Sequence, residues 1–446
     1  MKYQEIYDLY MKPYAGDVAI KARIEQGIEK NRKGNCNIRL LDRYGNPISN
    51  TKVCLNQISH EFRYGANMLM LDEFGDEQTN LAYRDTFYKY FNIGTVPFYW
   101  STLEPERGKP RYAADSEKIY RRPPTDLCVD YCKEKGIDAK LHCLVYEAHV
   151  PDWLKDMSLD EVKAEYERHF AEIAERYADT LFEVEVINEV LLSPEWKKTS
   201  PLANAPDMIP WAFELARRYF PNSTLVFNEG QRWDSIGKNK RLDAYPLLLE
   251  NAILKGADIN KIGMQSHIFV GAGAQTPEQY DAELIKWMEF GNANNMFTSL
   301  DTLAQFGLPL EITEITIPTF GEGEEYEDLQ AQMLRLWYSI FFSHPSVNTA
   351  VYWNTVDGYC YAPSPEHDEN RCRGGLFHKD LSPKKSALML KHLFDEEWHT
   401  EATLYTDEDG YLSFRGFLGN YSLSANGLNT IVSLKLAEND LTVTLK

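Results

Sequence analysis

The sequence predicts an α/β protein built as a (β/α)8 barrel, a TIM barrel, with a small accessory β-sandwich formed by the N- and C-terminal segments. Three observations predict this fold class. Short apolar strands alternate with helical stretches eight times between residues 62 and 396. Two of the strands, 181–190 and 308–316, carry Glu189 and Glu314 near their ends, where a barrel gathers strand termini at one face. The flanking segments alternate apolar and polar residues in short runs, as strands do.

The N-terminal segment, residues 1–61, begins with a charged stretch in which we expect a helix over 18–31. Two strand-like runs follow on either side of the turn at 43–47. They predict a β-hairpin or a β-arch.

The barrel segment, residues 62–396, contains eight strand-like runs. They are 62–68, 91–97, 138–146, 182–189, 224–229, 261–267, 308–314 and 348–354. The run at 182–189 has Val184, Val186 and Ile187 on both faces, which is typical of a parallel strand covered on both sides. Helices are expected within 75–90, from Pro123-Pro124 onward, over 159–178 and over 383–394.

The C-terminal segment, residues 397–446, alternates strand-like runs with Asp-Gly and Glu-Asn-Asp turns. Neither this segment nor the N-terminal strands have enough strands to form a stable sheet alone. We therefore expect the two to combine into one sandwich, in which the N-terminal segment, helix included, takes part.

Composition excludes several classes of partner. The 446 residues carry a formal net charge of −20, which argues against nucleic acid or an anionic membrane. No apolar run approaches the roughly 18 residues of a membrane span, and the N-terminus has no apolar signal region. We expect a cytoplasmic protein, or a secreted one if a leader precedes this sequence. Seven scattered cysteines are read as free thiols, and no metal or nucleotide motif is present, so neither a metal nor a cofactor is expected.

Polar residues gather at the C-terminal ends of several predicted strands. They are Asn188, Glu189, Asn228, Gln265, His267, Glu314 and Trp353, together with His142 on the third strand. Buried polar groups are costly unless paired, so their convergence favours a functional site over packing. Two carboxylates, one protonated and one ionised, suit the cleavage of a glycosidic bond. An aromatic content of 13% adds rings on which a sugar could stack.

At these residues the chain resembles the family 10 glycoside hydrolases, best known as endo-β-1,4-xylanases. The matching stretches are 91–108, 141–154, EVINEV (185–190), GMQSHI (263–268), GLPLEITEI (307–315), VYWNTVDGY (351–359) and 374–387. The resemblance implies a barrel and retention of anomeric configuration, with Glu189 as acid/base and Glu314 as nucleophile. It also implies that His142, Asn188, Gln265, His267 and Trp353 surround the sugar at the cleaved bond.

The chain departs from that family on the glycone side. Thr95 to Trp100, TVPFYW, stands where the family commonly has Glu-Asn-Glu-Met-Lys-Trp, so that Val96 and Tyr99 replace polar residues. Tyr146-Glu147-Ala148-His149 stands in place of Trp-His-Ser-Gln, and Tyr361 in place of a tryptophan. The predicted substrate-contacting residues of this region are Tyr99, Trp100, Tyr146, Glu147 and Tyr361. Each lost hydrogen bond costs about 1 kcal/mol, so we expect plain xylan to bind weakly. An ionised Glu147 is expected to repel a uronic acid.

The sequence therefore predicts a retaining β-glycosidase that hydrolyses β-1,4-xylan-like poly- or oligosaccharides by double displacement, with altered glycone-side specificity. One alternative is a specialised β-glycosidase for short or aglycone-bearing glycosides. Another is a non-catalytic carbohydrate-binding barrel, against which both retained glutamates argue. The expected partner is a β-linked saccharide. The sugar itself, endo or exo cleavage and the oligomeric state stay open.

Overall fold

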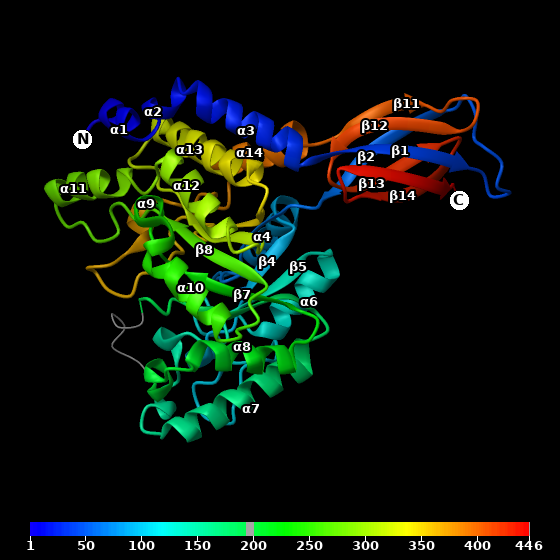
Figure 1. The fold of residues 1–446 in the computed structure, drawn as a ribbon. Helices are drawn as coiled ribbons and strands as arrows, with labels where there is room; N and C mark the ends of the chain where they lie inside the picture. Colours follow the sequence, from blue (N-terminus) through cyan, green and yellow to red (C-terminus); the bar gives the residue numbers. More distant parts are fainter. Residues whose placement is uncertain (193–199, 446) are drawn as a thin grey trace.

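A closed barrel of parallel strands forms the centre of the molecule, as a computed structural model of residues 1–192 and 200–445 describes it (Figure 1). Its strand order is β10-β3-β4-β5-β6-β7-β8-β9. The strands are β3 (Arg63–Asn67), β4 (Ile93–Pro97), β5 (Asp138–His142), β6 (Leu181–Asn188), β7 (Thr224–Glu229), β8 (Lys261–His267), β9 (Leu310–Thr316) and β10 (Val347–Tyr352). The predicted fold class, a (β/α)8 barrel with extra β-sheets from the chain termini, is confirmed.

Helices surround the barrel. They are α4 (Glu77–Tyr90), α5 (Trp100–Leu103), α6 (Thr125–Lys135), α7 (Leu159–Tyr177), α8 (Met208–Tyr219), α9 (Trp233–Asn239), α10 (Ala244–Leu254), α11 (Pro277–Met288), α12 (Ala293–Ala304), α13 (Glu324–Ser343) and α14 (Lys385–His392). Helix α7 shows why the sequence folds this way. Its N-terminus is a capping box in which the Glu161 carboxylate accepts from the Ser158 backbone N–H at 2.8 Å. Its apolar face then buries Val162, Tyr166 and Phe170 against the barrel.

The inside of the barrel is charged, which the apolar strand pattern does not indicate. The Lys140 ammonium lies 2.6 Å from a Glu185 oxygen and 2.5 Å from a Glu311 oxygen, and Lys261 pairs with Glu183. All five side chains are buried. An unpaired buried charge costs several kcal/mol, so these pairs favour the strand register that keeps them together.

The accessory sandwich consists of two sheets. One contains β1 (Lys33–Leu41), β12 (Tyr411–Phe417) and β15 (Glu438–Thr444); the other contains β2 (Lys52–His60), β11 (Glu401–Tyr405), β13 (Gly419–Ala425) and β14 (Leu428–Leu434). Because β1 and β2 lie in different sheets, their connection is an arch and not a hairpin. Ile38, Leu40, Val53, Leu55 and Leu423 form part of the shared core. The sandwich extends away from the barrel, at the upper right of Figure 1.

The N-terminal helices pack on the barrel and not in the sandwich, in contrast to the grouping expected from the sequence. They are α1 (Tyr3–Tyr10), α2 (Lys12–Ala15) and α3 (Val18–Asn31). Ile6, Tyr10 and Ile20 join the barrel's apolar core, and the Tyr10 hydroxyl donates to the Leu284 carbonyl at 2.7 Å. The strong apolar face of α1 explains the difference, since it needs a partner that the thin sandwich lacks.

Within the described residues, no helix is long and apolar enough to cross a membrane. All seven cysteines lie within the described residues as free thiols.

Candidate active site

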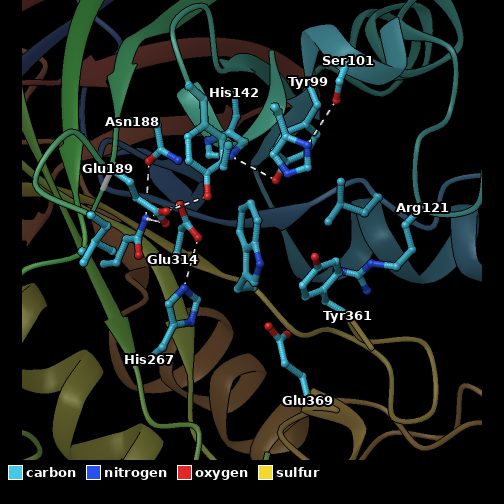
Figure 2. A pocket seen from close by; sticks show the side chains of 18 of the residues that line it. Tyr99, Ser101, Arg121, His142, Asn188, Glu189, His267, Glu314, Tyr361 and Glu369 are labelled. Atoms are coloured by element: carbon cyan, nitrogen blue, oxygen red, sulfur yellow. Dashed lines mark hydrogen bonds and ion pairs between the residues drawn. The ribbon is translucent and has the colours of Figure 1, made fainter. Parts of the chain in front are cut away.

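A pocket of about 830 Å³ opens at the C-terminal end of the barrel strands (Figure 2). Ten of the residues predicted to form the site line it: Tyr99, His142, Tyr146, Asn188, Glu189, Gln265, His267, Glu314, Trp353 and Tyr361. The pairing of neighbouring strands brings several of them together, because Asn188 lies beside Asn228 and Gln265 lies beside Glu314. The register of the paired strands thus places residues that are more than a hundred positions apart in the sequence in one cluster.

The two predicted catalytic carboxylates lie side by side and share a donor. The Gln265 side-chain nitrogen donates to Glu189 Oε1 at 2.7 Å and to Glu314 Oε1 at 3.0 Å. Those two oxygens are therefore no farther apart than the sum of these distances. This upper limit is compatible with the ~5–5.5 Å between the two carboxyl groups of a retaining glycosidase, where one carboxylate is the nucleophile. It is shorter than the ~6.5–9.5 Å between the carboxyl groups of an inverting glycosidase, which leaves room for a water molecule.

Glu189 has the environment of a proton donor. Burial raises its pKa above the ordinary value, and the charge of Glu314 raises it further. The Tyr146 hydroxyl donates to Glu189 Oε2 at 2.6 Å and partly opposes this rise. The Glu189 backbone is in the left-handed region, with φ +55°, where non-glycine residues are uncommon. This turn ends β6, and the Glu189 N–H bonds to the Asn228 carbonyl at 3.2 Å.

Glu314 is surrounded by polar side chains from the neighbouring strands. Asn228 donates to its Oε1 at 3.1 Å, in addition to the bond from Gln265. The His267 ring nitrogen Nε2 faces Oε2 at 3.1 Å, while Nδ1 contacts the Thr316 hydroxyl at 2.9 Å. Oε1 thus accepts hydrogen bonds from two side-chain amides, and Oε2 has a ring nitrogen of His267 within hydrogen-bonding distance.

His142 is coupled to the charges inside the barrel. Its Nδ1 bonds to the Glu185 carboxylate, which Lys140 also contacts. Burial lowers the pKa of His142, but the Glu185 charge outweighs this effect and the net pKa is raised. The pKa of Glu185 itself falls to about 2, because Lys140 and His142 outweigh its burial. The other nitrogen of His142 lies 3.1 Å from the Tyr99 hydroxyl, so this ring is held on both sides.

Asn228 lies behind the pocket and not on its surface. It is fully buried, and its side-chain NH₂ donates to Asn188 Oδ1 at 2.8 Å as well as to Glu314. Thr313 in turn donates to Asn228 Oδ1 at 2.5 Å. The structure therefore gives Asn228 a supporting position, in contrast to the predicted contact with substrate.

Trp100 and Glu147 lie away from the pocket, which contradicts the predicted contacts. The Trp100 indole stacks on His169 with ring centres 4.2 Å apart and donates to Glu104 at 2.9 Å. Glu147 accepts from the Ser200 backbone N–H at 2.6 Å, and burial raises its pKa to about 7. Val96 is also buried, in the barrel core. Their side chains serve packing because the loops after β4 and β5 turn them inward.

Other residues that line the pocket were missed. They include Leu69, Ser101, Arg121, Arg122, His149, Arg232, Phe269, Trp287, Phe290, His367 and Glu369. His149 is two residues beyond Glu147 and contacts Ser101 Oγ at 3.3 Å. Ser101 and Trp287 lie in the short helix α5 and in α11, and most of the others lie outside the regular elements. Ser101 and His149 fall within the stretches that match the family, which could have marked them; the remaining residues carry no such signal. Among residues 1–192 and 200–445, no group of three or more His, Cys, Asp or Glu could hold a metal ion.

Comparisons with known proteins agree on one family. The sequence model of Glycosyl hydrolase family 10 matches residues 73–391. Endo-1,4-beta-xylanase B of Cellvibrio japonicus is 26% identical over 264 residues, 58% of this chain and 38% of that protein. Endo-1,4-beta-xylanase 1 of Arabidopsis thaliana is 23% identical over 411 residues, 90% of this chain and 37% of that protein. The chain thus spans less than two fifths of the length of either relative.

Solved structures support the same fold. Xylanase 10B of Thermotoga petrophila, in complex with xylobiose, superposes with a TM-score of 0.59 at 20% identity, covering 76% of this chain and 95% of that one. At this identity the likeness establishes the barrel architecture alone.

Proposed function

The chain belongs to glycosyl hydrolase family 10, and from this premise we propose that it is a retaining β-glycosidase that hydrolyses β-1,4-xylan-like saccharides. The observation that carries the proposal is the Glu189–Glu314 pair, held by one Gln265 amide in two different environments. One carboxyl is disposed to stay protonated and the other to stay ionised, as double displacement requires.

In the first step Glu314 attacks the anomeric carbon while the glycosidic bond breaks. The leaving oxygen takes the proton of Glu189, whose raised pKa favours the protonated carboxyl. The result is a covalent glycosyl ester of Glu314 and a Glu189 carboxylate. Asn228 and His267, which contact the two oxygens of Glu314, orient the nucleophile.

In the second step the Glu189 carboxylate takes a proton from a water molecule. The water oxygen bonds to the anomeric carbon as the ester bond to Glu314 breaks, so that Glu189 is protonated again and the sugar leaves with its original configuration. His142, positioned by Glu185, and Trp353 form the wall beside the reacting sugar.

We further propose that glycone-side recognition differs from that of enzymes that favour plain xylan. Tyr99 fills the wall beside His142 and engages its ring nitrogen at 3.1 Å, so one hydrogen-bonding position is used within the protein. A specialised glycosidase for short or aglycone-bearing glycosides is the second candidate. It is favoured by the aromatic ring of Tyr361, 43% exposed at the pocket.

The test compares soluble xylan, xylo-oligosaccharides, and aryl β-xyloside and β-cellobioside, with Glu314→Gln as control. Turnover of any of them that is lost in Glu314→Gln supports the hydrolase. Saccharide binding without release of product would instead identify a carbohydrate-binding barrel. A rate on polymeric xylan equal to that on aryl glycosides and oligosaccharides would contradict the altered specificity.

We also propose that residues 36–58 and 398–446 form one β-sandwich packed on the barrel, and that the barrel segment, 62–396, alone supplies the pocket residues. Deleting 398–446 exposes Ile38, Leu40, Val53 and Leu55, and we expect insoluble or destabilised protein. A soluble truncation with an unchanged Tm would show that the strands at 36–58 do not need the C-terminal strands.

A further inference from the structure

One wall of the pocket contains two adjacent arginines, Arg121 and Arg122, together with Tyr99 and Tyr361. We call these four residues the glycone wall. Figure 2 shows Arg121 and Tyr361 across the pocket from Glu189. The leaving group departs beside Glu189, its proton donor. A sugar that contacts the opposite wall therefore belongs to the glycone, the part of the substrate on the other side of the cleaved bond.

Neither arginine has an acidic partner within the part of the chain that the structure describes. Arg121 is 6% exposed, and its only protein acceptor there is the Tyr359 carbonyl. Arg122 donates to the Arg121 carbonyl at 2.8 Å, and its guanidinium lies 4.0 Å from the centre of the Tyr99 ring. The Nε groups of both are buried without an acceptor. Buried guanidinium groups are normally paired, so the two unpartnered donors are unexplained by the fold alone.

The loop that carries these arginines is fixed in place. Arg111 donates to the Thr102 and Glu117 carbonyls at 2.8 Å each and to the Arg122 carbonyl at 3.2 Å. Pro123 and Pro124 follow directly and restrict the backbone. Arg121 itself has φ +60°, a conformation that a glycine would adopt with less strain. The chain thus keeps an arginine where local backbone preference disfavours one.

We propose that the glycone wall binds the carboxylate of a uronic acid, so that the enzyme acts on acidic β-linked saccharides whose glycone carries a hexuronic acid. A guanidinium group forms paired, charge-assisted hydrogen bonds with a carboxylate, and two adjacent groups fit one such anion. Tyr361 supplies a ring on which the sugar can stack. This inference deepens the proposed function and rests on it.

The expectation that a uronic acid is repelled rested on Glu147, which the structure turns away from the pocket. Glu369 is an acidic group that lines the same pocket. Asn354 donates to its Oε2 at 3.0 Å, and His367 faces Oε1 at 3.9 Å. The glycone wall itself contains two arginines and no carboxylate; the other acidic residues that line the pocket are Asp152, Glu189 and Glu314.

The experiment measures binding in the inactive Glu314→Gln background, so that affinity is read without turnover. The probes are cellobiose and cellobiouronic acid, which differ only in the oxidation of C6 on the non-reducing sugar, and a disaccharide with a sulfate ester at that carbon. We expect the uronic acid to bind roughly tenfold or more tightly than cellobiose, since two charge-assisted hydrogen bonds are gained. Equal affinity of the acid and the neutral sugar overturns the inference. Tighter binding of the sulfate ester than of the acid would replace the carboxylate by a sulfate as ligand.

Variants of the wall locate the effect. Arg122→Gln and Arg121→Gln are each expected to remove most of the preference for the acid, while Arg122→Lys keeps part of it. Arg335→Gln, on the outer helix α13 and paired with Glu397 at 2.7 Å, is the matched control that keeps the full preference. A preference that survives both Gln variants, with a Tm within the range of the control, would place the carboxylate elsewhere and refute the proposal.

Turnover separates this inference from the function on which it depends. With otherwise wild-type enzyme, the same substitutions are expected to raise KM for an acidic aryl glycoside and leave kcat nearly unchanged. No hydrolysis of any aryl glycoside, neutral or acidic, would refute the hydrolase. Hydrolysis of the neutral glycoside, without an advantage for the acidic one, would refute only the acidic specificity.

Discussion

The floor and the wall of the pocket are built differently. The catalytic floor, which we define as His142, Asn188, Glu189, Gln265, His267 and Glu314, comes from the ends of β5, β6, β8 and β9. Five of its members bond to one another, while His142 bonds to Glu185 and Tyr99, and the register of paired strands fixes the spacing. The glycone wall comes from loops; Arg122 lies over the Tyr99 ring and Arg121 donates to the Tyr359 carbonyl, and neither has an acidic partner among the described residues.

This difference separates chemistry from specificity. The floor is a closed network, so a change in one member disturbs its neighbours and the reaction itself. The wall residues line the pocket and its arginines have no acidic partner among the described residues, so we expect a change there to alter which sugar binds. The following experiments test whether the two parts are separable in this way, from the largest expected effect to the smallest.

Glu314→Gln is expected to have the largest effect, a loss of kcat of more than roughly 10⁴-fold on every substrate, because the covalent step has no other nucleophile. Rates of release from aryl glycosides with good and poor leaving groups measure it. A residual kcat above roughly one hundredth of the wild-type value on these glycosides would mean that Glu314 is not the nucleophile.

Glu189→Ala is expected to lose roughly 10²–10⁴-fold on glycosides with poor leaving groups, the usual share of general acid catalysis. Formation of the glycosyl ester from an activated aryl glycoside should be largely spared, since that leaving group needs little protonation. Azide, which attacks without a general base, should restore the second step. A uniform loss across leaving groups, without rescue by azide, would argue against Glu189 as the acid.

Tyr146→Phe tests the residue that connects floor and wall. Its hydroxyl donates to Glu189 at 2.6 Å and stabilises the ionised carboxylate, so its removal raises the already raised pKa of Glu189. The proton donor then stays protonated to higher pH. The alkaline limb of kcat/KM should move upward by about half to one pH unit, which corresponds to a hydrogen bond of about 1 kcal/mol. A limb that moves downward or not at all would exclude Glu189 as the group titrating there.

The sequence indicated that the floor residues lie together, and it indicated Tyr99 and Tyr361 of the wall but not its two arginines, for a physical reason. A parallel strand has a fixed rise per residue, so polar residues at the ends of β6, β8 and β9 had to meet at one face of a barrel. Loop residues follow no such rule. Arg121 and Arg122 gave no periodic signal, and Glu147 was predicted to contact substrate because it stands where the family has a histidine.

The interior of the barrel shows the same limit. Lys140, Glu183, Glu185 and Glu311 stand within strands whose apolar content predicted plain packing. Alternation along one strand shows which side chains share a face, but not which charge on another strand neutralises them. Only closure of the barrel brings the pairs within 2.6 Å.

Glu147→Gln gives the smallest expected effect on function. It tests whether Glu147 contacts the substrate or only supports the loop behind the pocket. The Glu147 carboxyl is buried against Ser200 and Tyr166, so we expect an unchanged KM for neutral and acidic glycosides alike. His149→Ala, two residues away on the pocket surface, serves as the comparison and should raise KM a few-fold. A change in KM for Glu147→Gln that matches or exceeds that of His149→Ala would return Glu147 to the binding wall.

Stability against pH supplies the readout that does respond to Glu147. Burial raises its pKa from the ordinary 4.5 to about 7 in the folded protein, so the fold favours the protonated carboxyl. The folded state therefore binds more protons than the unfolded state between these values, and the free energy of unfolding falls as pH rises from about 4.5 to 7. Glutamine keeps an oxygen for the Ser200 N–H and cannot ionise, so the variant escapes this fall. Urea unfolding at pH 5 and pH 8 should show similar stability at the lower pH and an advantage for the variant of at most about 3 kcal/mol at the higher one. If the stability of the two proteins changes with pH in the same way, the Glu147 carboxyl is solvated and titrates normally. Glu147 would then have to be counted among the residues that line the pocket.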